Sequence, residues 1–186
     1  MAPDPAALPP APRWQGVNHL ALVTPDMDTT VRFYAGVLGM RVVATTLAGP
    51  MRHYFFEMSP QNTVAFFEDP GATTFAKPAG GPGDRAIQMD HIAFNVADAD
   101  ALEQLRARLL AAGSEVTEVI DHGFIRSVYF TDPNGIALEA SHWVVDGTAG
   151  EVDPTDPALF EDPDPVPALA ELHADGLTRV PWTRLV

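Results

Sequence analysis

The stretch VNHLALV at residues 17–23 returns later in the chain as MDHIAFN at residues 89–95. His19 and His91 are 72 positions apart, and each is the third residue of its stretch. In both stretches bulky apolar residues alternate with smaller or polar ones, which is typical of a strand with two different faces. The recurrence predicts that this strand exists in two related copies.

A second pair of stretches keeps the same offset. NTVAFFE at residues 62–68 lies over NGIALEA at residues 134–140, so that Phe67 falls on Glu139. An offset shared by both ends of a segment predicts two copies of one supersecondary unit.

Each copy is expected to fold as one strand, a helix and three further strands. Apolar residues follow the first strand at helical spacing, up to Leu38 before Gly39 in one copy and up to Gly113 in the other. Runs rich in β-branched and aromatic residues come next, including SEVTEVI at residues 114–120. The predicted fold class is α+β, with two tandem βαβββ modules that form mixed sheets. The expected divisions are a Pro/Ala-rich leader (1–14), the first module (15–70), a Gly/Pro-rich linker (71–86), the second module (87–143) and an acidic, Pro-rich tail (144–186).

Strand alternation places three polar side chains on the small-residue faces of these sheets. His19 and His91 share their faces with alanines, whereas the bulky apolar neighbours point the other way, toward the helix. Glu139 lies on the matching face of the last strand, where an unpaired buried carboxylate would be costly. If the sheets combine about a pseudo-twofold axis, the three side chains converge as two imidazoles and one carboxylate, a set that holds divalent iron and leaves coordination positions open. The alternative is a structural cluster in which Glu139 hydrogen-bonds a histidinium.

Composition excludes several classes of function. The 186 residues are 46% hydrophobic, and no apolar run approaches the roughly 18 residues that would span a bilayer. The formal charge of −14 argues against nucleic acid and anionic lipid as partners. The absence of cysteine excludes disulfides and thiolate ligands, so any metal must use histidine and carboxylate. The leader does not read as a secretory signal, and we expect a cytoplasmic protein.

Much of the negative charge is concentrated in the tail. Seven acidic residues lie between residues 146 and 164, interleaved with prolines and without lysine or arginine. This part is expected to be a solvated tail or a wrapping arm, and the apolar C-terminal end is expected to dock on the body or on a second subunit.

These residues resemble the vicinal oxygen chelate superfamily, which includes glyoxalase I, bleomycin-resistance proteins, fosfomycin-resistance enzymes, methylmalonyl-CoA epimerase and type I extradiol dioxygenases. The resemblance covers about residues 15–143 and implies paired βαβββ modules around a metal-binding cleft. Glyoxalase-like members usually take a metal ligand from each first and each fourth strand; here Phe67 stands opposite Glu139, and Glu68 should face outward by alternation. Extradiol dioxygenases use two histidines and one glutamate, which His19, His91 and Glu139 match.

The stretch from residue 121 to 143 favours the extradiol pattern. His122, a spacer of five residues, Val128-Tyr129, the turn Asp132-Pro133-Asn134-Gly135 and Glu139 follow one another as they do in the ring-cleaving enzymes. The resemblance implies that Glu139 is an iron ligand and that His122 and Tyr129 lie near a bound catecholate. The turn is common across the superfamily, so His122 and Tyr129 carry the specificity.

One position departs from the dioxygenases. Their catalytic histidine lies at the start of the fourth strand of the first module, where this chain has Asn62, and asparagine cannot take up a proton at neutral pH. His53, on the neighbouring strand, is the candidate substitute; the alternative is a structural role for this histidine.

The expected function is a metal-dependent, extradiol-dioxygenase-like enzyme that acts on a vicinal diol or related aromatic small molecule with O2. Fe(II) is the expected metal, with manganese, nickel, zinc and cobalt as alternatives, and the resemblance implies a homodimer. Two other functions stay open at this point. One is a glyoxalase- or epimerase-type lyase or isomerase, in which Glu68 or Glu139 is the base. The other is a non-catalytic small-molecule binder like the bleomycin-resistance proteins.

Overall fold

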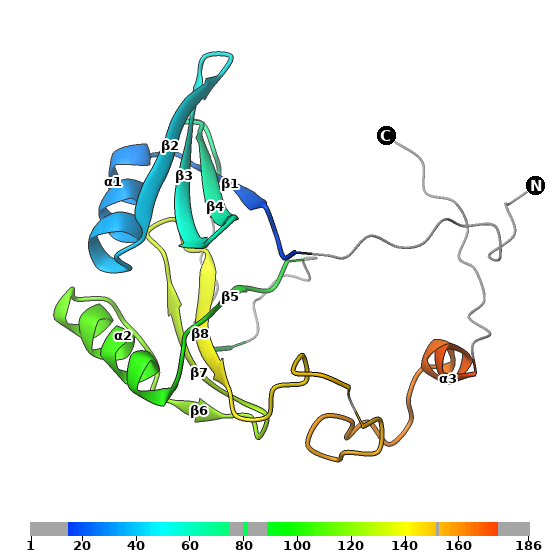
Figure 1. Cartoon of the computed structure of the whole chain (residues 1–186). Coiled ribbons are helices and arrows are strands. Elements are labelled where there is room, and N and C mark those ends of the chain that lie inside the picture. Colours follow the sequence, from blue (N-terminus) through cyan, green and yellow to red (C-terminus); the bar gives the residue numbers. More distant parts are fainter. Residues whose placement is uncertain (1–14, 75–79, 82–88, 152, 175–186) are drawn as a thin grey trace, which may run out of the picture.

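The computed structural model describes residues 15–74, 80–81, 89–151 and 153–174 and contains two four-stranded sheets, each with a helix on one side (Figure 1). The two modules are stacked end to end, and α1 and α2 lie on the same side of the molecule. The predicted leader, most of the predicted linker and the last part of the tail lie outside the described residues.

The first module runs from β1 to β4. Asp26 caps its helix by accepting a hydrogen bond from the Thr29 backbone N–H at 3.1 Å. The elements are β1 His19–Thr24, α1 Met27–Val31, the π-helix η2 Arg32–Val37, β2 Arg41–Ala48, β3 Met51–Ser59 and β4 Asn62–Glu68.

The second module runs from β5 to β8 and is followed by a short helix in the tail. Asp98 caps α2 at its start, and Gly113 follows the helix in the left-handed conformation with φ 79°. The elements are β5 Ile92–Asn95, α2 Ala99–Ala111, β6 Ile120–Asp121, β7 Ile125–Thr131, β8 Ala137–Trp143 and α3 Pro167–His173.

Both sheets have the same topology. Their strand orders are β1-β4-β3-β2 and β5-β8-β7-β6, and the first strand of each module runs parallel to the fourth. Ala21 pairs with Ala65 in one sheet, and Ala93 pairs with Glu139 in the other. The prediction of an α+β fold with two βαβββ modules and mixed sheets is therefore confirmed.

Two predicted elements differ in detail. The predicted first helix changes at Arg32 from α to π geometry, and the Leu38 N–H donates to the Phe33 carbonyl at 2.9 Å. The prediction of a strand over residues 114–120 was mostly wrong. Apart from the short β6, this segment makes one isolated bridge, from Val116 to Phe130. Its backbone is held in part by a side chain, because Arg106 donates to the Thr117 carbonyl at 2.9 Å.

The helix-facing sides of both sheets build one core. Its fully buried members include Tyr34, Phe56 and Phe66 from the first module and Phe130 and Leu138 from the second. The bulky apolar residues thus pack against the helices, as alternation predicted.

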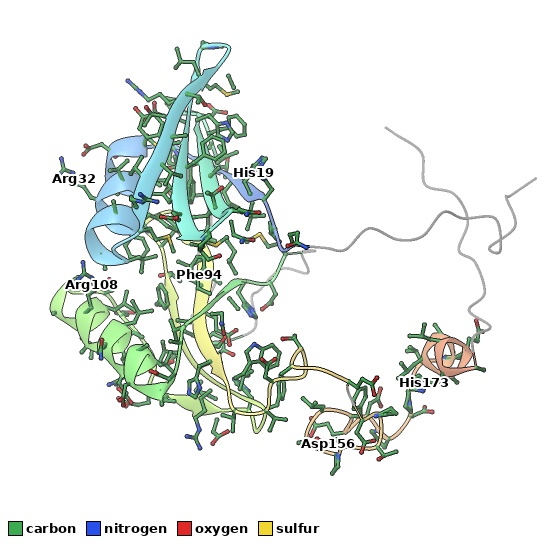
Figure 2. The ribbon with its side chains drawn as sticks, viewed as in Figure 1. His19, Arg32, Phe94, Arg108, Asp156 and His173 are labelled. Atoms are coloured by element: carbon green, nitrogen blue, oxygen red, sulfur yellow. The ribbon has the colours of Figure 1, made fainter. Side chains whose placement is uncertain are left out.

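The small-residue faces have the opposite character. Ala21 on β1 and Ala93 on β5 are exposed, and both strands lie at an edge of their sheets. Figure 2 shows His19 on the edge strand of the upper module and Phe94 on the edge strand of the lower one. Within the described residues no further strand pairs with the outer edge of β1 or β5.

The described part of the tail extends to one side of the body in Figure 1 and ends with α3. Leu172 on this helix is 54% exposed. Leu169 on the same helix is half-buried. The other apolar residues of the C-terminal end lie beyond residue 174, outside the described part. Among the described helices, none is long and apolar enough to cross a membrane.

Candidate metal centre

Two of the three predicted metal ligands meet in the second module. Glu139 on β8 pairs with Ala93 on β5, and His91 lies two residues before that alanine on the same face. The His91 Nε2 atom is 2.7 Å from Oε2 of Glu139. The Glu139 side chain is only 3% exposed, so a carboxylate is held in the interior beside one imidazole.

The other ring nitrogen of each candidate histidine is bound by the residue before it. Nδ1 of His91 is 2.7 Å from the Asp90 carboxylate, and Nδ1 of His19 is 2.9 Å from the Asn18 amide oxygen. A histidine that ligates a metal through one nitrogen commonly donates its other N–H to such an oxygen, which fixes the ring and its tautomer. The same arrangement at equivalent positions directs both Nε2 atoms away from these partners, and Nε2 of His91 faces the Glu139 carboxylate. Imidazole nitrogen and carboxylate oxygen are donors that suit a divalent metal.

Tyr129 and His122 extend this face of the second sheet. Tyr129 on β7 pairs with Glu139, and its hydroxyl lies 2.9 Å from Nε2 of His122. The rings of Tyr129 and His91 meet edge to face, with centroids 6.0 Å apart. Burial, reinforced by the negative charge of Glu139, raises the pKa of Tyr129. The phenol therefore stays protonated at neutral pH and can donate a hydrogen bond.

Ser127 belongs to this group but was not predicted. It is fully buried on β7, and its hydroxyl donates to Oε1 of Glu139. Alternation places Ser127 on the same face as Tyr129, two residues further on. That spacing was the only feature of the sequence that could have pointed to Ser127, because serine is a common residue in strands.

The first module contributes a different set of side chains. His53 stacks on Phe67 with centroids 3.7 Å apart and an interplanar angle of 11°, and it also contacts Phe55. The His19 ring lies edge-on to His53 at 6.4 Å. Burial, together with the nearby His19, lowers the pKa of His53, and its buried Nε2 atom has no hydrogen-bond partner among the residues that the structure describes. His53 is therefore neutral at pH 7.

A single chain does not bring all the predicted ligands together. Among the described residues, no three histidine, aspartate or glutamate side chains are grouped so that they could hold one metal ion. Glu139 lies on the second sheet and His91 directly before its edge strand β5, whereas His19 lies on the first sheet. The three-ligand site therefore stays a prediction for this chain.

Asn62 is engaged in a turn. Its amide donates to the Pro60 carbonyl at 2.8 Å, and it packs so closely on Gly16 that a Cβ atom there would come within 2.5 Å of its oxygen. Asn62, which stands where dioxygenases carry a catalytic histidine, is thus held by neighbouring residues of its own module.

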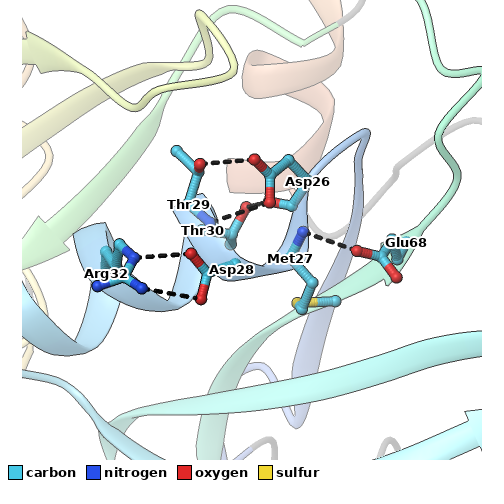
Figure 3. Close-up of polar contacts among 7 residues, drawn as sticks. All are labelled: Asp26, Met27, Asp28, Thr29, Thr30, Arg32 and Glu68. Carbon is cyan, nitrogen blue, oxygen red and sulfur yellow. Dashed lines mark hydrogen bonds and ion pairs between the residues drawn. The ribbon is translucent and has the colours of Figure 1, made fainter.

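Glu68 is also held by other groups. It accepts a hydrogen bond from the Met27 N–H at 2.9 Å, at the start of α1 (Figure 3). It also pairs with Arg52. The Met27 N–H is the main cause of a lowered pKa for Glu68, followed by Arg52. Glu68 thus anchors the first helix to β4.

We expect Glu68→Gln to reduce the free energy of unfolding by about 1 kcal/mol at pH 7, because a carboxylate accepts a hydrogen bond more strongly than an amide. A lowered folded-state pKa gives stability that is present above the ordinary value of 4.5 and is lost as the pH falls below it. Urea unfolding of both proteins should therefore show a difference at pH 7 that vanishes in acid. A difference that persists or grows in acid would contradict this role.

Comparisons with known proteins agree with this fold. The family model for the Glyoxalase/Bleomycin resistance protein/Dioxygenase superfamily matches residues 16–140. The chain therefore belongs to this superfamily. No curated protein matched the sequence.

Several similar solved structures each cover about 70% of this chain. A glyoxylase/bleomycin resistance protein/dioxygenase domain from Frankia sp. EAN1pec is 24% identical, with 70% of this chain and 98% of that chain covered and a TM-score of 0.59. A lactoylglutathione lyase from Agrobacterium tumefaciens is 22% identical (70% and 96% covered, TM-score 0.52). The fosfomycin resistance protein FosX from Listeria monocytogenes is 18% identical (69% and 93% covered, TM-score 0.52). At these identities the similarity shows the fold alone.

Proposed function

We propose that this protein is an Fe(II)-dependent, extradiol-dioxygenase-like enzyme that acts on an aromatic small molecule with two vicinal oxygens. The observation that carries the proposal is the continuous polar face formed by His91, Glu139, Tyr129 and His122. This face joins the His91–Glu139 pair, whose carboxylate is buried, to a tyrosine–histidine pair. The two pairs supply, side by side, groups for binding a metal and groups for binding a substrate oxygen.

The proposed site is completed by a second copy of the chain. His19 begins β1, an edge strand of the first sheet, and His91 comes directly before β5, an edge strand of the second. If β1 of one chain lies beside β5 of another, His19 of the first chain approaches the His91–Glu139 pair of the second. In such a homodimer each site combines the first module of one chain with the second module of its partner, so two sites form per dimer.

Each half of this site would have its own task. His19, His91 and Glu139 would hold the metal, which supplies two-point binding of the substrate oxygens and activation of O2. Tyr129 would donate its phenolic proton to a substrate oxygen, and His122 would orient that phenol through their hydrogen bond. Phe55 and Phe67, around His53, would offer a flat apolar surface for a ring.

His53 would take the place of the missing catalytic histidine. It is neutral, its Nε2 atom has no hydrogen-bond partner within the described part of the chain, and it lies on the same face as His19. These properties suit a base that accepts a proton from a substrate hydroxyl.

The alternative function, a lyase or isomerase, requires a further carboxylate ligand from the first module. Glu68 is the nearest counterpart of Glu139, and it is occupied by the Met27 N–H and Arg52. This observation favours three ligands over four.

The proposal is tested with protein purified without oxygen. We expect about one iron per chain, and oxygen uptake with formation of yellow ring-fission products when a panel of catechols is added. His53→Gln and Tyr129→Phe should keep the iron and lose most of the turnover. Iron without oxygen uptake on any catechol would favour the isomerase function, and protein that binds no metal would favour a small-molecule binder.

A further inference from the structure

We infer that Ser127 is a positioning residue, which holds one oxygen of Glu139 so that the other is presented beside His91. The inference rests on the proposed function, because it concerns how the chain prepares its carboxylate ligand.

The two oxygens of Glu139 have separate partners. Oε1 accepts the hydrogen bond from the Ser127 hydroxyl, and Oε2 lies 2.7 Å from Nε2 of His91. The carboxylate lies between strands β7 and β5, and rotating it would break one contact or the other. Because Ser127 and Glu139 are both buried, solvent does not reach them to replace a lost hydrogen-bond partner.

The position of Ser127 on β7 directs its hydroxyl toward Glu139. On β7, its neighbour Val128 points into the core, whereas Ser127 and Tyr129 point to the face that carries Glu139. The Ser127 hydroxyl donates to Glu139, whereas the Tyr129 hydroxyl is hydrogen-bonded to His122.

The hydrogen bond from Ser127 to Glu139 is expected to affect which metal ion the site prefers. A carboxylate whose Oε1 atom is held by Ser127 offers mainly Oε2 to an ion. Released from that hydrogen bond, it could bind through both oxygens, which suits ions that accept more and looser oxygen ligands. Loss of the hydroxyl should therefore change both the affinity and the coordination of the metal.

The experiment compares wild type, Ser127→Ala and Ser141→Ala by titration of the metal-free proteins with Co2+ and with Mn2+. Ser141 is the matched control, because it pairs directly with Ser127 and lies on the same strand as Glu139. We expect Ser127→Ala to bind Co2+ about 10-fold more weakly, the effect typical of losing an outer-shell partner. It should also lose less affinity for Mn2+ and show a weaker Co2+ absorption band, since extra oxygen ligands raise the coordination number. Ser141→Ala should match wild type, and Ser127→Thr, which keeps the hydroxyl, should restore the wild-type spectrum.

The possible results separate this inference from the proposed function. If wild type binds Co2+ and Ser127→Ala has the same affinity and spectrum, the positioning role is wrong and the metal site stands. Equal losses in Ser127→Ala and Ser141→Ala would overturn it as well, because they would report general loosening of the sheet. If wild type binds neither ion, the proposed metal site fails, and the role of Ser127 fails with it. Should the added methyl of Ser127→Thr lower the melting temperature, the two alanine variants decide alone.

Discussion

Replacing Glu139 by glutamine should abolish metal binding while the protein remains folded. The substitution removes the only charged ligand of the proposed site but keeps the size of the side chain and an oxygen that can accept the hydrogen bond from Ser127. We expect metal affinity to fall by more than about 100-fold, beyond the usual effect of losing an outer-shell partner. Metal content after dialysis, together with a titration followed by calorimetry, measures the loss.

Glu68→Gln is the matched control for this variant. It makes the same chemical change on the fourth strand of the first module, where the carboxylate is bound to the Met27 N–H and to Arg52. It should keep the wild-type metal content. Metal binding that survives in Glu139→Gln, or is lost equally in both variants, would contradict the assignment of Glu139 as a ligand.

Asp132→Ala should destabilise the whole chain by about 3 kcal/mol, because it leaves several buried donors without a partner. Asp132 is 4% exposed and accepts hydrogen bonds from the backbone N–H groups of Asn134 and Ile136 at 2.9 and 2.8 Å. It also accepts a bond from the Tyr34 hydroxyl at 3.3 Å, which crosses from the first module to the second. Burial raises the pKa of Asp132, although its hydrogen bonds oppose that effect. Urea unfolding at pH 7 measures the change.

Asp162→Ala is the control for this prediction. Asp162 also accepts a hydrogen bond from the backbone N–H two residues on, at 2.9 Å, but it lies in the exposed tail. Its replacement should change the unfolding free energy by less than about 0.5 kcal/mol. A loss below about 1 kcal/mol in Asp132→Ala would mean that the contact between the modules contributes little to stability.

The parts of the fold that depend on local pattern could be predicted from the sequence. The repeat at His19 and His91 marks strands whose faces differ in character, and such alternation survives in the structure because each strand buries one face against a helix. The pairing of Glu139 with His91 followed from the same alternation. The helix α2 was predictable from its apolar spacing, its cap at Asp98 and the glycine after it.

Other features depend on contacts between distant residues. The Tyr34–Asp132 hydrogen bond joins positions far apart in the sequence, and no periodic pattern of residues predicts it. The segment 114–120 has the composition of a strand, but much of it forms other contacts, including the bond from Arg106 to Thr117. Ser127 is recognisable only once Glu139 is known to lie beside it.

The most direct test of the shared metal site is the metal content of a mixed dimer. His19→Ala and His91→Ala chains, each with a different affinity tag, are expressed together, and dimers that carry both tags are isolated in two steps. A site made of β1 from one chain and β5 and β8 from the other leaves one intact site in each mixed dimer. We therefore expect one metal ion per mixed dimer and none in either parent homodimer. A mixed dimer without metal, or a His19→Ala homodimer that keeps its full metal content, would contradict the account.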